Sequence, residues 1–172
     1  MNIFERLIEI ALIIIIAISV VIYILFTTKR KRIRQTYSNI DRKLKRRWNL
    51  LSDLAEVIKN YPNYEESTLE KLTVLKNQDY DKFEMKQRIE IDNNISKIVS
   101  KIVEISDDNQ ELKTNDKFIE ISSELFDIEK EITEFKDSYN KDVKSYNKGI
   151  ERIPENIIAI LFGFNEEKEL EN

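Results

Sequence analysis

The sequence predicts an all-α protein in which an N-terminal transmembrane helix is followed by a long up-and-down helical bundle. Three observations predict this fold class: an apolar run near the N-terminus, apolar residues that recur every three or four positions afterwards, and few residues that break helices. Only two Gly and two Pro occur among the 172 residues. Because these residues supply tight turns, their scarcity favours long helices with few connections.

The apolar run is long enough to cross a membrane. It extends over Leu7–Phe26, where only Glu9 and Ser19 interrupt it. At about 1.5 Å per residue, a helix of this length spans a hydrocarbon core of about 30 Å. A cleaved signal peptide is disfavoured because it would carry several basic residues before the run, where Arg6 stands alone. The residues that we expect to mark the membrane span are Leu7, Ile10 and Phe26.

Basic residues follow the predicted span at once and predict its orientation. The residues expected to contact lipid headgroups are Lys29, Arg30, Lys31, Arg32 and Arg34. Because Lys and Arg accumulate on the cytoplasmic side of a span, we expect the N-terminus outside the cell and residues 29–172 in the cytoplasm. The chain then divides into the N-terminus and span (1–28), a basic juxtamembrane segment (29–36), a helical bundle (37–153), and an apolar C-terminal segment with an acidic tail (154–172).

Two helical segments of the bundle can be read from the apolar period. Over Ile33–Tyr61 the apolar residues lie three or four positions apart, and Pro62 ends this stripe because the residue before proline avoids the α region. A second stripe covers Leu69–Ile105, and its later part consists of Ile91, Ile95, Ile98, Ile102 and Ile105. Its middle is polar, which indicates either a solvated part of one long helix or a break. We favour a break near Asn77–Asp81, so that three long segments form four helices.

The third segment has the most regular stripe. Its apolar residues follow a heptad-like pattern over Phe118–Ile153, with one stutter at Tyr139–Val143, after a cap at Thr114 or Asn115. Pro154 ends it, and the next residues (156–164, NIIAILFGF) are nearly all apolar. This segment either caps the bundle or docks on lipid or on a partner. Its candidate docking residues are Ile158, Phe162, Gly163 and Phe164.

A second basic cluster lies farther from the predicted span. In an upright helix Lys45 would lie about 28 Å beyond Phe26, whereas charges are screened over about 8 Å at physiological salt. We therefore expect this cluster to pair with acids of neighbouring helices, or with an acidic partner or a second membrane. Nucleic acid is disfavoured because no platform of aromatic residues, on which bases could stack, accompanies the cluster. The candidate residues for these ion pairs are Lys45, Arg46, Arg47 and Glu129.

The composition also limits the chemistry of the chain. It has no Cys and no His, which removes disulfides, thiolate metal sites, the commonest general base and the commonest metal ligand. It has no glycine-rich phosphate loop and no plausible nucleophile–base pair. We therefore expect no enzyme, no cofactor and no small-molecule substrate. Four polar residues of the third segment either lie at a helix interface or form a recognition surface: Tyr139, Asn140, Tyr146 and Asn147.

Several motifs occur in an order and spacing that cover nearly the whole chain. They are residues 40–47 (IDRKLKRR), 68–70 (TLE) and 112–118 (LKTNDKF), then Tyr139-Asn140, Tyr146-Asn147, Pro154 and Phe162-Gly163-Phe164. In these motifs the chain resembles the LemA family of bacterial proteins. The resemblance implies a single-pass membrane protein with an up-and-down bundle counted as four helices. It also implies a link to intracellular membrane compartments, because some relatives look like participants in forming them. Ser52 and Lys130 depart from the pattern, which often has Pro at the first position and usually Asn at the second.

These observations together predict a membrane-anchored, non-catalytic helical scaffold that acts by contact. The expected partners are membrane lipids, a membrane-associated protein and further copies of the chain, and no nucleic acid. The alternative is a membrane-shaping or membrane-organising protein that self-assembles on the cytoplasmic leaflet.

Overall fold

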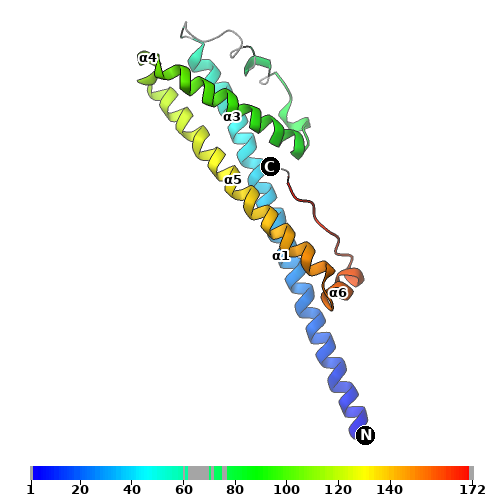
Figure 1. Ribbon diagram of the computed structural model, residues 1–172. Coiled ribbons are helices and arrows are strands. Elements are labelled where there is room, and N and C mark those ends of the chain that lie inside the picture. The colour runs from blue at the N-terminus through cyan, green and yellow to red at the C-terminus, as the bar shows by residue number, and fades with distance from the viewer. Residues whose placement is uncertain (1, 60, 62–69, 71, 75–76, 171–172) are drawn as a thin grey trace. The chain divides into compact units, whose positions relative to one another are not determined.

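The computed structural model describes residues 2–59, 61, 70, 72–74 and 77–170, and all regular secondary structure in this part of the chain is helical (Figure 1). The predicted all-α class is confirmed. The principal elements are α1 (Ile3–Ile58), a 3-10 helix η1 (Tyr80–Lys82), α3 (Met85–Asp107), α4 (Gln110–Lys113), α5 (Asp116–Glu151) and α6 (Glu155–Phe162). The described residues form two compact units. Unit 1 comprises residues 2–37 and 137–170, and unit 2 the described residues of 38–136.

Helix α1 is continuous from the apolar run into the first stripe of the bundle, as the scarcity of Gly and Pro predicts. At its start, the Asn2 N–H donates to Glu5 Oε2 over 2.9 Å, so that a first-turn carboxylate satisfies an amide at the helix N-terminus. Ser52 does not interrupt the helix. Pro62, predicted to end this segment, lies outside the described residues. One helix therefore contributes both the apolar run and part of the bundle core.

The core of unit 2 is built from three apolar stripes. The buried apolar side chains are Ile40, Leu44, Trp48, Leu50, Leu51, Leu54, Val57 and Ile58 of α1, Ile89, Ile95, Val99 and Ile102 of α3, and Phe118, Ile121, Leu125, Ile128 and Ile132 of α5. Full burial of one such side chain contributes about 1.5–3 kcal/mol. The predicted stripe of α5 matches this core closely, whereas that of α1 misses the buried Leu50, Leu54 and Val57. Leu69 and Leu75 of the predicted second stripe lie outside the described residues.

The predicted face of α3 is partly wrong. Ile95 and Ile102 are buried as predicted, but Ile91, Ile98 and Ile105 are only half-buried. The buried face instead also contains Ile89 and the carboxylate residue Asp92. Asp92 lies three residues before Ile95 and therefore on the same face of the helix. The core-facing side of α3 thus includes a polar residue, which a pattern of apolar residues does not reveal.

The predicted break in the second segment is present. Residues 77–84 contain no α-helix, and η1 places Tyr80 in contact with Trp48, at 5.2 Å between ring centroids. Tyr80 is buried and the Arg88 guanidinium lies 4.8 Å from its ring centroid. Helix α3 then begins with a capping box between Glu84 and Gln87. The few apolar residues of this polar patch are thus used to cover Trp48 rather than to continue a helix.

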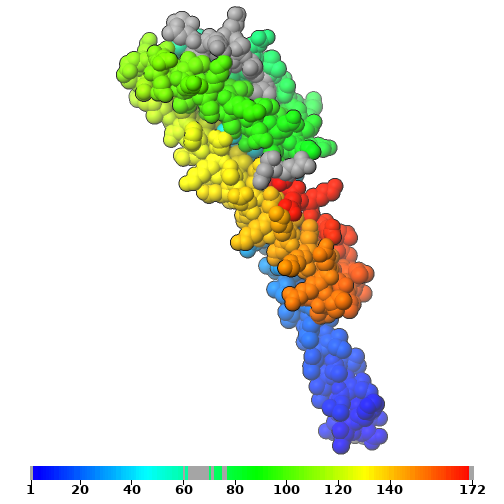
Figure 2. Space-filling model, viewed as in Figure 1, coloured from blue at the N-terminus to red at the C-terminus, as the bar shows by residue number. Residues whose placement is uncertain are grey.

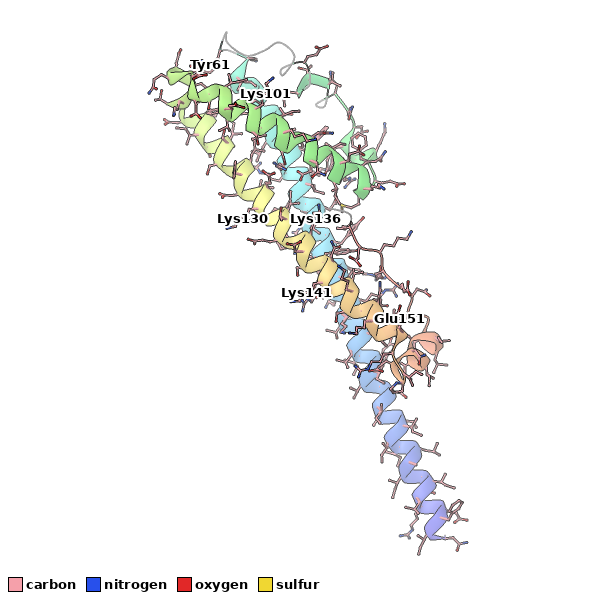
Figure 3. The ribbon with its side chains drawn as sticks, viewed as in Figure 1. Tyr61, Lys101, Lys130, Lys136, Lys141 and Glu151 are labelled. Carbon is pink, nitrogen blue, oxygen red and sulfur yellow. The ribbon has the colours of Figure 1, made fainter. Side chains whose placement is uncertain are left out.

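Side-chain caps define the turn between α3 and α5. Asn109 Oδ1 accepts from the Leu112 N–H over 3.1 Å, and Asn115 Oδ1 accepts from the Phe118 N–H over 2.9 Å. These bonds satisfy amides that a helix N-terminus leaves free. Of the two predicted caps, Asn115 is the one used, and its Nδ2 also donates to Tyr61 Oη over 3.1 Å (Tyr61 is labelled in Figure 3).

Unit 1 consists of the first part of α1, the last part of α5, α6 and the C-terminal tail (164–170). Its buried side chains are Ile22, Phe26, Ile33, Tyr139, Val143, Tyr146, Ile158 and Ala159. The helices approach closely at Gly149, where an added Cβ would lie 3.0 Å from Phe26 Cε1. The predicted position of Ile153 in the stripe is wrong: α5 ends at Glu151, and Ile153 is 76% exposed because the chain has left the helical register.

Candidate functional site

The first part of α1 exposes apolar side chains on all its faces. Leu7, Ile10 and Ile16 are 59%, 54% and 62% exposed. On the face shown in Figure 2, no other described residues cover this segment, drawn in blue. It is the one stretch in the described residues that is long and apolar enough to cross a membrane. Phe26, the last residue of the predicted span, is instead covered by protein, since it is only 4% exposed and contacts Tyr146.

Three of the five juxtamembrane basic residues contact other groups of unit 1. Lys29 Nζ donates to Ser145 Oγ over 3.1 Å, Arg30 Nε lies 3.1 Å from Glu167 Oε1, and Arg32 Nε lies 2.6 Å from Asp142 Oδ2. The remaining two, Lys31 and Arg34, have exposed side chains. The basic segment therefore binds the end of α5 and the tail, and it also presents positive charge to solvent.

Helix α6 has one face against the protein and one face exposed. Ile158 and Ala159 are buried, whereas Ile157, Ile160 and Leu161 are 61%, 80% and 72% exposed. Of the candidate docking residues, Ile158 thus belongs to the core of unit 1. Gly163 ends the helix with φ +69°, a left-handed conformation that favours glycine.

Aromatic rings join α6 and the following residue to α1. The Phe162 ring lies 4.9 Å from that of Tyr23, and the half-buried Phe164 ring lies 5.3 Å from that of Phe26. Tyr23 belongs to the apolar run of α1. These ring contacts hold α6, together with its exposed apolar residues, against the end of that run within unit 1.

The C-terminal tail is held along α5 by side-chain amides (Figure 1). Asn147 bonds both backbone groups of Glu167, accepting from its N–H over 3.0 Å and donating to its carbonyl over 2.8 Å. Asn140 does the same at Leu170, over 2.8 and 2.9 Å. The Tyr139 hydroxyl donates to the Lys168 carbonyl over 2.9 Å, and burial raises the pKa of this hydroxyl. The two amides therefore bind the chain's own tail. The rings of the two tyrosines lie at the interface with α1, since Tyr139 lies 6.1 Å from Tyr37 and the buried Tyr146 lies 5.8 Å from Phe26, between ring centroids.

The second basic cluster pairs with acids in unit 2. Arg46 donates to both oxygens of Glu124, over 2.7 and 2.9 Å, and this bond raises the pKa of Arg46. Lys45 Nζ donates to Asp81 Oδ1 over 2.6 Å and lowers the pKa of that carboxyl. Both pairs are largely exposed to solvent. Exposed pairs of this kind contribute little to stability because water and salt screen their charges.

Arg47 differs because its side chain is fully buried. Its Nη1 lies 2.6 Å from Asp92 Oδ1, while Nη2 lies 3.0 Å from Ser96 Oγ and 3.1 Å from Glu129 Oε2. The structure thus brings Arg47 and the sequence-predicted Glu129 together. Burial raises the pKa of Asp92, and the charge of Arg47 opposes this rise. Because both charges are removed from water, loss of either Arg47 or Asp92 would leave the other as a buried charge without its partner, which is strongly destabilising.

A family model, described as the LemA family, matches residues 36–172, which is most of the chain. The chain belongs to the LemA family. No curated protein matches it. The LemA match includes the buried Arg47, the amides that hold the tail and the tail itself, but not the apolar run of α1. The predicted family is therefore confirmed, while the role of the run rests on its own residues.

Two residues that contact Arg47 in this LemA chain are not predicted from the sequence. Asp92 and Ser96 are four residues apart on α3, and Ser96 Oγ also donates to the Asp92 carbonyl over 3.2 Å. The available signal is the position of Asp92 between Ile89 and Ile95, in the helical register of apolar residues. Lys130, which departs from the family pattern, is exposed on α5 and is labelled in Figure 3.

Proposed function

We propose that this LemA-family chain is a membrane-anchored helical scaffold with its N-terminus outside the cell and its bundle in the cytoplasm. The observation that carries this proposal is the exposure of apolar side chains all around the first part of α1, where even Ile13 is 66% exposed. In lipid these side chains lose their contact with water, and the helix satisfies its own backbone hydrogen bonds. The scaffold acts by contact and carries out no reaction.

The basic segment supports the proposed orientation. Only Arg6 precedes the apolar run, whereas the exposed Lys31 and Arg34 follow it. Cytoplasmic loops carry such an excess of Lys and Arg. Charges close to an anionic leaflet contribute about 1 kcal/mol each to membrane binding.

We further propose that α6 lies in the membrane interface. Its exposed apolar residues Ile157, Ile160 and Leu161 belong to one short helix, and Phe162 contacts Tyr23 near the end of the run. A helix attached at this level places its apolar face at the boundary between headgroups and acyl chains. Of the two predicted roles of the C-terminal segment, docking on lipid is thus the one we favour, with Ile158 and Ala159 keeping the helix on the protein.

The topology can be tested with introduced thiols, because the chain contains no cysteine. Asn2→Cys is placed before the run, and Lys141→Cys on the exposed side of α5 (Figure 3). In intact cells, a membrane-impermeant maleimide should label Asn2→Cys and should label Lys141→Cys only after permeabilisation. Labelling of Lys141→Cys in intact cells would overturn the orientation. Release of the chain from membranes by alkaline carbonate would overturn the anchoring.

A second candidate function, membrane shaping by self-assembly, is favoured by exposed apolar residues on α5. Ile119 and Phe126 are 50% and 63% exposed and lie seven residues apart, which places them on one face of the helix. Chemical cross-linking in membranes separates the two functions. One dominant foreign partner supports the scaffold, whereas a ladder of homo-oligomers that is lost in Phe126→Ser supports shaping.

A further inference from the structure

The tail-binding surface is formed by Tyr139, Asn140, Lys144 and Asn147 of α5 with Arg30 of α1, and it contacts residues 167–170. Five hydrogen bonds of this surface go to backbone groups of the tail. Backbone groups are the same in every residue except proline. The surface therefore recognises an extended main chain largely independently of its side chains.

The spacing of the two amides fits an extended peptide. Asn140 and Asn147 are seven residues apart, which corresponds to about 10.5 Å along a helix. Glu167 and Leu170 are three residues apart, which corresponds to about 10 Å in an extended chain. Asn147 binds the earlier tail residue and Asn140 the later one, so the tail runs antiparallel to α5. Two helical turns thus match three residues of the peptide.

Charge adds a preference for acidic peptides. Arg30 Nε lies 3.1 Å from Glu167 Oε1, and Lys144 Nζ lies 3.2 Å from Glu169 Oε2. These two carboxylates occupy alternate residues of the tail. The surface therefore accepts an extended segment with acids two residues apart, which the C-terminus of this chain supplies.

We propose that the tail-binding surface also binds in trans, and that its occupant is then the C-terminal tail of a second copy of the chain. A second copy carries the identical tail and can make each of these contacts, which is the condition for low-cost exchange of an element between protomers. The tail leaves α6 at Gly163, beyond which no helix constrains it. The inference rests on the proposed anchoring, because copies in one membrane share depth and orientation and so meet at a high effective concentration.

Cross-linking of two differently tagged copies tests this exchange. One copy carries Lys144→Cys and the other Glu169→Cys, and a short bis-maleimide is added to isolated membranes that contain both full-length chains. Because each copy has a single thiol, a product with both tags arises only in trans. The substitutions remove the Lys144–Glu169 ion pair of the surface but leave all five hydrogen bonds to the tail backbone in place. We expect a doubly tagged product, and its absence would overturn the proposal.

A matched control pairs Glu169→Cys with Glu151→Cys in place of Lys144→Cys. Glu151 is also exposed on α5, but it lies about 10.5 Å farther along the helix, away from Glu169. Its doubly tagged product should be at least about fivefold weaker, and equal yields from both pairs would overturn a defined site. If chains that resist carbonate extraction give no trans product, exchange fails while the anchoring stands. Chains that are extracted refute the anchoring itself.

Proline substitutions in the Glu169→Cys copy test whether the main chain is recognised. Leu170→Pro removes the N–H that donates to Asn140, whereas Lys168→Pro removes an N–H for which none of the described residues is an acceptor. Loss of one hydrogen bond to a well-placed amide corresponds to about a tenfold loss of binding. We expect Leu170→Pro to lower the trans product about tenfold and Lys168→Pro to lower it less than threefold. Equal effects would overturn main-chain recognition.

Discussion

Unit 2 and unit 1 are each held together by polar contacts, but of opposite kinds. In unit 2, buried Arg47 joins α1 to α3 and α5 through the side chains of Asp92, Ser96 and Glu129. In unit 1, Asn140 and Asn147 join α5 to backbone groups of the tail. The first kind requires particular side chains at particular positions, whereas the second accepts many sequences. The comparison suggests a permanent contact in unit 2 and an exchangeable one in unit 1.

The largest expected effect is the removal of the buried guanidinium. Arg47→Met leaves Asp92 buried without its charged partner, and breaking such a pair costs about 3–5 kcal/mol. We expect this loss in the free energy of unfolding, measured by denaturant titration of the full-length protein in detergent and followed by circular dichroism. The control, Arg46→Met, removes an exposed pair and should cost less than about 1 kcal/mol. Similar losses from both variants would show that the contribution of Arg47 to the free energy of unfolding does not depend on its burial.

A smaller effect of the same site is its pH dependence. Burial raises the pKa of Asp92 above its value in the unfolded chain, so the folded state binds this proton more tightly. The contribution of Asp92 to stability is therefore fully present below the unfolded pKa and is lost as the pH rises through the folded pKa. Asp92→Asn should remove this loss from a plot of unfolding free energy against pH.

The exposed carboxylate Asp81 provides a control of opposite sign. Its pKa is lowered by the hydrogen bond from Lys45, so its contribution is present above the unfolded pKa and is lost as the pH falls through the folded pKa. Asp81→Asn should therefore flatten the acid side of the same plot. If the two variants change the plot in the same direction, the opposite environments inferred for Asp92 and Asp81 are wrong.

In unit 1, removal of a polar contact should release the tail locally rather than destabilise the whole protein. Asn147→Leu removes two hydrogen bonds to Glu167, each contributing about 0.5–1.5 kcal/mol. We expect the Glu167 amide to exchange its hydrogen roughly tenfold faster, measured by mass spectrometry, with little change in the unfolding of the whole protein. Lys141→Leu, on the exposed side of the same helix, is the control and should leave this exchange unchanged. Global destabilisation by Asn147→Leu would remove the distinction between the two units.

The sequence predicts the contacts of the two units unequally, for a physical reason. Apolar periodicity identifies a helix and its buried face, and so it predicts α1, the stripe of α5 and the break before α3. It cannot tell that Arg47, next to Trp48 in the α1 stripe, is drawn inside, since this depends on Asp92 of a distant segment. The period places Asn140 and Asn147 on one face of α5, but their partner is an irregular tail that has no period of its own.

The same reasoning explains why the predicted burial of Ile153 is wrong. The spacing of Ile153 from Ile150 fits the stripe of α5, but spacing predicts burial only while the helix continues. Helix α5 ends at Glu151, before the predicted stripe does, and α6 begins at Glu155. The change of direction buries Ile158 and Ala159 instead. An apolar period is thus least informative at its ends, where the connection decides which residues are covered.

The smallest expected effect concerns the packing beneath the tail. In Gly149→Ala the new Cβ would lie 3.0 Å from Phe26 Cε1, so the Phe26 ring must shift. Alanine in a helix is favoured over glycine by about 1 kcal/mol, which opposes the cost of that shift. Because Phe26 also contacts Phe164 at the start of the tail, a displaced ring should loosen the tail more than it destabilises the protein. We expect a change in unfolding free energy within about 1 kcal/mol, together with faster hydrogen exchange at Glu167. Phe26→Leu in the Gly149→Ala background should restore slow exchange by making room for the new methyl group, and failure of this rescue would show that close packing at Gly149 does not control the tail.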